Sequence, residues 1–239
     1  MRRMPQFERP GVSLYYEEHG HGFPVLLFAP GGMRSAVEVW SRSPWHPIHS
    51  LASSFRLIAL DQRNAGRSTA QVTAADGWHT YAADHLALLD HLGIARCHVL
   101  GGCIGSAFAL RLIETAPERV GAAVLQNPIG LHDNRDLFYA MFDQWQSGLA
   151  PRLPELELDG WRAFRERMYG GDFVFSVSRE FVRECRTPLL ILAGNDPYHP
   201  PPISRELAAL APSATLVEGW KDALPATVER ARSFLAEGC

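Results

Sequence analysis

The chain has 239 residues, of which 46% are hydrophobic and 21% charged, and its formal net charge is −3. This composition is typical of a globular protein with one large domain. The slightly acidic balance excludes the basic surface expected of a nucleic-acid-binding protein or an anionic-membrane-binding protein. No apolar run approaches the roughly 18 residues that span a bilayer, and no apolar stretch of the secretory type follows the N-terminal arginines. We therefore expect no membrane association and a cytoplasmic location.

The four cysteines and ten histidines show no spacing typical of a metal site. The sequence contains neither a C-x-x-C motif nor an H-x-x-x-H motif. Without an export signal, reduced thiols are expected rather than disulfides. We therefore predict no metal and no cofactor.

Short apolar runs alternate with amphipathic segments, a pattern that predicts an α/β fold with a mostly parallel central sheet and helices on both faces. Pro10 and Gly11 separate the first two runs, which are predicted to form a hairpin. The expected strands cover residues 7–9, 12–17, 25–29, 56–61, 97–102, 122–127, 189–194 and 214–218. Helical spacing predicts helices over 80–92 and 104–116, which end at Gly93 and Pro117.

Between Gly130 and Thr187 this alternation is interrupted. The segment carries aromatic residues on helix-like stretches, at positions 138, 139, 142, 145, 161, 164, 169, 173, 175 and 181. We interpret residues 131–186 as a small helical cap, inserted over the carboxyl edge of the sheet in a single domain that spans residues 1–239. The alternative is that these are further crossover helices whose aromatic side chains pack into the core.

The main chemical signal is a G-x-C-x-G sequence, Gly101-Gly102-Cys103-Ile104-Gly105, between a strand and a helix. Small residues around a sharp strand-to-helix bend are typical of a nucleophile elbow, which lifts the nucleophile above the sheet. The helix N-terminus would favour the thiolate of Cys103, and the N–H group of Ile104 would face a developing oxyanion. The alternative is a buried cysteine in a glycine-rich turn.

Four segments, in this order, resemble the α/β-hydrolase family, and the resemblance covers most of the chain from Val25 to Leu235. Residues 29–32 are similar to the family's His-Gly oxyanion loop, with Pro30 in place of the histidine. Residues 61–68 are similar to its D-x-R-G-x-G-x-S loop, with Asn64 at the first glycine. Residues 89–94 match its approach to the nucleophile, and residues 189–200 resemble the loop that carries its triad acid.

This resemblance implies Cys103 as the nucleophile and Asp196 as the triad acid. It also implies Gly32 and Ile104 as the oxyanion donors, with Met33 as a second candidate on the first loop. Hydrolases of this fold with a cysteine nucleophile exist, and attack by cysteine gives a thioester intermediate that suits activated esters, lactones or thioesters.

The chain departs from the family at the catalytic histidine, which belongs on the loop after the last strand. Residues 216–225 contain no histidine, and none follows His199 anywhere in the sequence. Three residues are candidates for the base: His199, three residues beyond Asp196; His132, just after the sixth strand; and Lys221, near the usual histidine position. A further alternative is that no base exists and the helix terminus alone generates the thiolate.

Three functions fit these observations. The first is a small-molecule hydrolase or acyl-transfer enzyme that works through a thioacyl intermediate on Cys103. The second is a ligand-binding protein that keeps the fold without catalysis, and the third is a cofactor-free lyase or isomerase. The cap aromatics favour a small apolar or aromatic substrate. The sequence leaves the oligomeric state open, a homodimer included.

Overall fold

Nine strands form one mixed sheet in residues 6–238, the part of the chain that the computed structural model describes. The strand order is β1-β2-β4-β3-β6-β7-β8-β9, and β5 pairs with β2. The bounds are β1 Gln6–Arg9, β2 Val12–His19, β3 Pro24–Phe28, β4 Arg56–Leu60, β5 Thr69–Ala70, β6 Cys97–Gly102, β7 Val120–Gln126, β8 Leu189–Leu192 and β9 Ala214–Val217. The β1–β2 hairpin is antiparallel and β2 runs antiparallel to β4, whereas β4, β3, β6, β7, β8 and β9 are mutually parallel. The expected α/β class and mostly parallel sheet are confirmed.

The central strands are buried on both faces, which explains their uninterrupted apolar sequences. Every residue of β6 and β7 is buried. Parallel strands end at a common edge, so the loops after β3, β6, β7, β8 and β9 converge there. This edge holds the residues discussed below.

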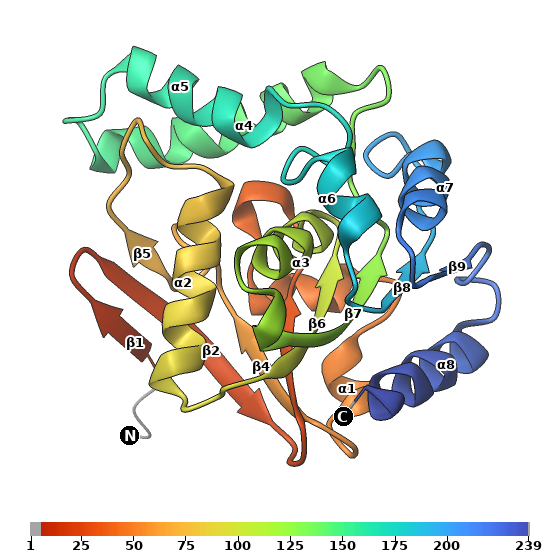
Figure 1. Cartoon of the computed structure of the whole chain (residues 1–239). Helices are drawn as coiled ribbons and strands as arrows, with labels where there is room; N and C mark the ends of the chain where they lie inside the picture. Colours follow the sequence, from red (N-terminus) through yellow and green to blue (C-terminus); the bar gives the residue numbers. More distant parts are fainter. Residues whose placement is uncertain (1–5, 239) are drawn as a thin grey trace.

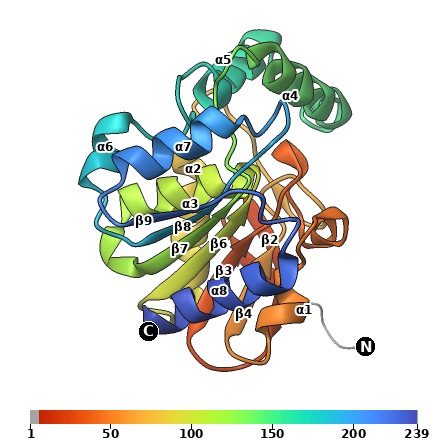
Figure 2. The same ribbon diagram turned by 90° about the vertical axis from the view of Figure 1, so that its right-hand side faces the viewer.

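Helices cover both faces of the sheet (Figures 1 and 2). One apolar cluster joins the sheet to α2, α3, α6 and α7, and a second joins the opposite face to α1 and α8. The α-helices are α1 Pro47–Leu51, α2 Trp78–His91, α3 Ile104–Thr115, α4 Arg135–Leu149, α5 Leu158–Tyr169, α6 Arg179–Glu184, α7 Pro201–Leu210 and α8 Leu224–Glu237. Short 3₁₀ helices are η1 Gly32–Arg34, η2 Val37–Arg42, η3 Pro117–Arg119 and η4 Ala150–Arg152. In residues 6–238 we find no helix with the length and apolar character that a membrane crossing requires.

The segment 131–186 contains α4, α5 and α6. Helices α4 and α5 lie across the top of the molecule, above the carboxyl ends of the parallel strands, whereas α6 lies lower, beside α7 (Figure 1). The aromatic side chains of this segment are largely buried and join the same core cluster as α2 and α3. Phe142 and Phe164, for example, meet edge to face with ring centroids 5.3 Å apart. The segment therefore combines the position expected of a cap with the core packing of the alternative interpretation.

The loop after β4 is braced from within by Asp61, which is fully buried. Its carboxylate accepts hydrogen bonds from the backbone N–H groups of Val37 (2.7 Å) and Arg67 (2.8 Å). Because Val37 begins η2, this contact fixes the start of the short helix whose last residue is Arg42, a residue that lines the cavity described below.

Candidate active site

Cys103 occupies a sharp bend between β6 and α3, with backbone angles φ 56° and ψ −119°. A positive φ is strained for a residue other than glycine and recurs at functional sites. The bend needs glycine on both sides, because a Cβ on Gly101 would lie 2.1 Å from the carbonyl oxygen of Gly105, and a Cβ on Gly105 would lie 2.2 Å from that of Phe28. Cys103 is only partly buried and lines a cavity that is described below. The bend has the form predicted from the G-x-C-x-G sequence.

Asp196 and His199 form a local pair on the loop after β8. The backbone N–H of His199 donates to the Asp196 carbonyl at 3.0 Å, and the N–H of Tyr198 donates to the Asp196 carboxylate at 3.0 Å. Within this turn, Nδ1 of His199 lies 2.7 Å from both carboxylate oxygens of Asp196. The carboxylate therefore orients the ring and supports its protonated form, as the acid of a catalytic triad does.

The ring of His199 faces the sulfur of Cys103. Burial disfavours the imidazolium, but the Cys103 thiolate and the Asp196 carboxylate outweigh it and raise the pKa of His199 to about 9. Burial likewise disfavours the thiolate, but His199 and the amides of Gly31 and Ile104 outweigh it and lower the pKa of Cys103 below its ordinary value. Nε2 of His199 is buried and has no hydrogen-bond partner in the described part of the chain. The opposite pKa shifts of Cys103 and His199 are those expected of a thiolate beside an imidazolium.

The loop after β3 brings its glycine amides to the same place. Gly31 has φ 118°, a conformation that favours glycine, and its amide and that of Ile104 help to lower the pKa of Cys103. Gly32 lies next along this loop, closely covered by Met141 of α4. Met33 is buried, and its sulfur lies 3.5 Å from the Tyr169 hydroxyl. Ile104, Gly32 and Met33 stay predictions as oxyanion donors, and the amide of Gly31 is a further candidate that the sequence did not single out.

Cys103 lines a cavity of about 310 Å³ at the carboxyl edge of the sheet. Its walls come from η2 and from the loops after β3, β6, β7, β8 and β9; the lining residues are Pro30, Gly31, Val39, Arg42, Ser43, Pro44, Gly102, Cys103, Gln126, Asn127, Asp196, His199 and Lys221. Among these described lining residues none belongs to α4, α5 or α6. The cap aromatics, from which we expected an apolar or aromatic substrate, are largely buried in the core cluster, and the nature of the substrate stays a prediction.

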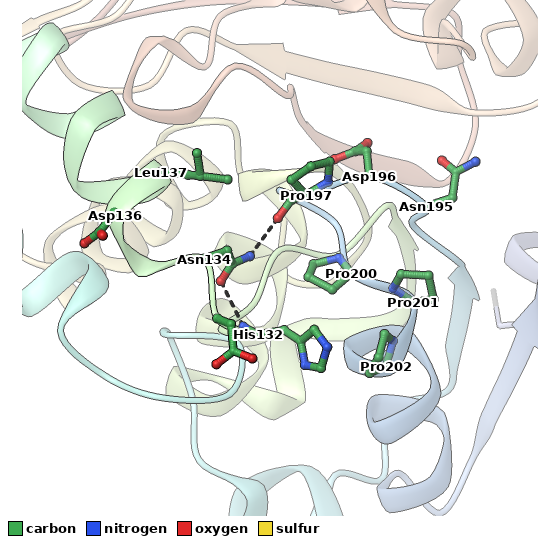
Figure 3. Close-up of a pocket in the computed structure, with 11 residues that line it drawn as sticks. His132, Asn134, Asp136, Leu137, Asn195, Asp196, Pro197, Pro200, Pro201 and Pro202 are labelled. Atoms are coloured by element: carbon green, nitrogen blue, oxygen red, sulfur yellow. Dashed lines mark hydrogen bonds between the residues drawn. The ribbon is translucent and has the colours of Figure 1, made fainter.

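His132, the second candidate base, lies elsewhere. It lines a separate hollow of about 680 Å³ together with Asn134, Pro197 and the run of prolines that begins α7 (Figure 3). Asn134 ties this hollow together, because it accepts a hydrogen bond from the His132 amide (2.8 Å) and donates one to the Pro197 carbonyl (2.7 Å). Asp196 lines both hollows, but His132 does not line the cavity that contains Cys103.

Lys221, the third candidate, does line the cavity with Cys103. Its Nζ donates to Asn195 Oδ1 at 2.6 Å and lies 5.6 Å from the centre of the Trp220 ring. Trp220 is buried and donates to the Ala193 carbonyl at 3.0 Å, which holds the loop after β9 against β8. The ammonium of Lys221 is thus hydrogen bonded to Asn195 at the cavity wall. Of the three candidate bases, His199 is the one that faces the sulfur.

Sequence reasoning left out three polar residues on the cavity wall, namely Arg42, Ser43 and Gln126. Gln126, the last residue of β7, donates from Nε2 to Ser43 Oγ at 2.9 Å, and its Oε1 is buried without a partner among residues 6–238. Arg42 reaches the cavity from the end of η2. The position of Gln126 at the carboxyl end of a central strand could have suggested it, because such ends meet at the ligand edge of a parallel sheet. The sequence holds no comparable signal for Arg42.

The other described thiols differ from Cys103. Cys97 and Cys185 are free and buried, and burial raises the pKa of Cys97 to about 12 and that of Cys185 above its ordinary value. Cys239 lies outside the described residues. Residues 6–238 contain no group of three His, Cys, Asp or Glu side chains placed to hold a metal ion.

Residues 24–161 match the family model for the alpha/beta hydrolase fold. Among curated proteins, the chain is 33% identical over 124 residues to a putative carbamate hydrolase, RutD, of Azorhizobium caulinodans, which covers 52% of this chain and 44% of that protein. It is 32% identical over 133 residues to the putative non-heme bromoperoxidase BpoC of Mycobacterium tuberculosis, covering 54% of this chain and 47% of that protein. The matched region thus spans less than half the length of these relatives.

Among solved structures, the meta-cleavage product hydrolase CumD of Pseudomonas fluorescens IP01 superposes with a TM-score of 0.73 at 19% identity, over 98% of both chains. At this identity the likeness concerns the fold alone. The family model nevertheless covers more than half of the sequence and includes the elbow at Cys103. The chain therefore belongs to the α/β-hydrolase fold family.

Proposed function

We propose that this protein is a small-molecule hydrolase or acyl-transfer enzyme that uses Cys103 as nucleophile, His199 as base and acid, and Asp196 as the residue that orients His199. The observation that carries the proposal is the convergence of His199 and two backbone amides on one sulfur at the wall of a cavity. The hydrolase name of the RutD relative supports the reaction class.

In the first step the Cys103 thiolate attacks the carbonyl carbon of an ester, lactone or thioester. The carbonyl oxygen becomes an oxyanion, which the N–H groups of Ile104 and Gly31 stabilise; Gly32 is the other donor expected on that loop. Two such donors typically account for a few kcal/mol of the barrier. When the carbonyl reforms, the bond to the leaving group breaks and the His199 imidazolium gives its proton to the leaving oxygen or sulfur.

The product of this step is a thioester on Cys103 with a neutral His199. Neutral His199 then takes a proton from water, and the resulting hydroxide attacks the thioester carbonyl. Collapse of the second oxyanion releases the carboxylic acid, and the proton on His199 restores the ion pair. With an alcohol, a thiol or an amine in place of water, the same sequence is acyl transfer.

The experiment is mass spectrometry of the intact protein during turnover of an activated aryl ester such as 4-nitrophenyl butyrate. We expect a burst of nitrophenolate and a mass increase of one butyryl group, located on Cys103 by peptide mapping. Cys103→Ala should abolish both, and His199→Gln should slow acylation and deacylation by at least about a hundredfold.

Cys185→Ala is the matched control, because Cys185 is a buried thiol remote from the cavity, and it should keep both the burst and the adduct. Turnover that survives in Cys103→Ala would refute the proposal. Ligand-dependent thermal stabilisation without turnover across ester, lactone and thioester panels would instead favour a binding protein.

A further inference from the structure

Another hollow, of about 320 Å³ and distinct from the one that His132 lines, adjoins the cavity that contains Cys103. Val39 and Arg42 line both spaces, so the two meet at η2. The rest of this hollow comes from η1, from the loop after β4, and from the C-terminal part of α4 with η4. Its lining is Arg34, Glu38, Val39, Arg42, Asn64, Ala65, Gly66, Trp145, Gly148, Leu149 and Arg152. We call it the arginine hollow.

Three guanidinium groups distinguish the arginine hollow. Arg34, Arg42 and Arg152 line it and form no ion pair with any other residue of the described chain. Glu38, an exposed side chain, is the single acid among its described lining residues. Other arginines pair with carboxylates, as Arg63 does with Asp84 at 2.7 Å, although a few outside the hollow, Arg186 among them, also form no ion pair within residues 6–238. The arginine hollow therefore stands out by bringing three such arginines together in one lining.

The positive charge continues into the cavity that contains Cys103. Lys221 stands on the wall of the Cys103 cavity, and it is the only lysine in the sequence. The cavity that contains Cys103 thus has one ammonium and one guanidinium group in its lining, those of Lys221 and Arg42, and Arg42 also lines the arginine hollow. A thiolate repels an anionic substrate, so these cations would serve to offset that repulsion.

The arginine hollow has fixed walls. Trp145 is buried and donates from Nε1 to the Asn64 carbonyl at 3.1 Å, which joins the cap to the loop after β4. Arg34 donates to the Gln144 carbonyl at 3.0 Å and so stands in place against α4. Arg152, in η4, has no hydrogen-bond partner in the described residues and leaves its donors free for a ligand.

We propose that the arginine hollow binds an anionic group of the substrate, a carboxylate or a phosphate, while the scissile carbonyl lies at Cys103. The guanidinium group suits this role because its fork of N–H donors matches two oxygens of either anion. This inference rests on the proposed function for the position of the carbonyl, but the anion site itself does not require catalysis.

The test compares three aryl esters: 4-nitrophenyl butyrate, which is neutral; 4-nitrophenyl hemisuccinate, with a carboxylate on the acyl part; and 3-carboxy-4-nitrophenyl butyrate, with a carboxylate on the leaving group. We expect kcat/KM to be higher for one of the charged esters than for the neutral ester. Arg152→Gln should lower that preference by about fivefold through KM, and Arg34→Gln combined with Arg152→Gln should lower it further. The charged ester whose advantage in kcat/KM is lost in these variants shows whether the substrate carries its charge on the acyl part or on the leaving group.

Arg186→Gln is the matched control, because Arg186 is also exposed and forms no ion pair within residues 6–238, but it lines a different hollow near the opposite end of β7. It should keep the preference. A preference that survives the double substitution, or that does not exist in the native protein, would overturn the proposal.

A second measurement separates this proposal from the first. Calorimetric titration of inorganic phosphate into Cys103→Ala tests the anion site without turnover, and Arg152→Gln in that background should weaken binding by about fivefold. Phosphate binding that depends on Arg152, without ester turnover by the native protein, would refute the proposed function and keep the subsite. Ester turnover without a preference for charged esters, and without phosphate binding, would keep the proposed function and refute the anion subsite.

Discussion

In the proposed mechanism, the reactivity of Cys103 depends on the charge of His199. Burial alone would raise the pKa of the Cys103 thiol, whereas the imidazolium and the two amides lower it below its ordinary value of 9.0. The Cys103 thiolate and the Asp196 carboxylate in turn raise the pKa of His199 from 6.5 to about 9. Between the lowered pKa of Cys103 and pH 9, the pair is therefore charged.

This pair predicts the pH dependence of alkylation by iodoacetamide. In the native protein the rate should level off at a pH below 9, since the thiolate is already formed there. In His199→Gln the inflection should move upward, and the rate at pH 7 should fall by at least about tenfold, because a neutral amide cannot hold the thiolate. His132→Gln is the control and should leave the profile unchanged.

The pH dependence of kcat/KM should be bell-shaped over the same pH range. The value of kcat/KM should fall below the lowered pKa of Cys103, where the thiol reprotonates, and again above about pH 9, where His199 loses the proton that the leaving group needs. An unchanged alkylation inflection in His199→Gln would show that the ion pair does not control the thiol.

At the site, the sequence pointed to one candidate nucleophile but left three candidate bases. The position of Cys103 follows from a local rule, the small residues of a strand-to-helix bend. The choice among His199, His132 and Lys221 depends on which side of the loop after β8 each side chain faces, and a linear pattern does not contain that information. Gly31 and Gly32 are neighbours in one glycine pair, so spacing alone does not say which amide points at the sulfur.

At the level of elements, the elbow depends on the contact between α3 and β3. Gly105→Ala would place a methyl group 2.2 Å from the Phe28 carbonyl oxygen, a backbone atom that cannot rotate away. We expect this substitution to lower the free energy of unfolding by at least about 2 kcal/mol, measured by urea denaturation with an unchanged m-value.

Gly148→Ala provides the comparison within another helix. Gly148 lies in α4, and a Cβ built there meets nothing within 4 Å. Because alanine favours helix more than glycine does, this change should raise the free energy of unfolding by about 0.5–1 kcal/mol. Equal effects of the two substitutions would mean that the contact between Gly105 and Phe28 does not constrain the elbow.

Most elements of the sheet were predictable because their apolar runs are long and buried on both faces. The predicted strand 97–102 coincides with β6, and the predicted helix 104–116 differs from α3 by one residue. β5 was not predicted, since Thr69–Ala70 is too short for an alternating pattern. Helices α1, α7 and α8 were not predicted either; α1 is short, and each of the three has a proline at its start.

For the whole molecule, the burial of the cap aromatics predicts one cooperative unfolding transition. Phe164 of α5 is 1% exposed and belongs to the core cluster that includes α2 and α3. Phe164→Ala should therefore destabilise the entire protein by about 3–5 kcal/mol. Leu158→Ala, on the same helix but 57% exposed, should change stability by no more than about 0.5 kcal/mol.

Differential scanning calorimetry checks this prediction. The native protein and Phe164→Ala should each give one transition whose calorimetric and van't Hoff enthalpies agree. An early, separate transition in Phe164→Ala would show that residues 131–186 unfold as an independent unit, contrary to a single domain.

Asp196 and His199 stand three residues apart in one turn, and this spacing has a consequence for substrate binding. In a triad whose acid and base come from distant loops, any movement of one loop disturbs both contacts of the histidine. Here a shift of the β8–α7 connection would carry the acid and the base together as a preassembled unit. Only one long-range distance, from this unit to the sulfur, would then depend on the position of that connection.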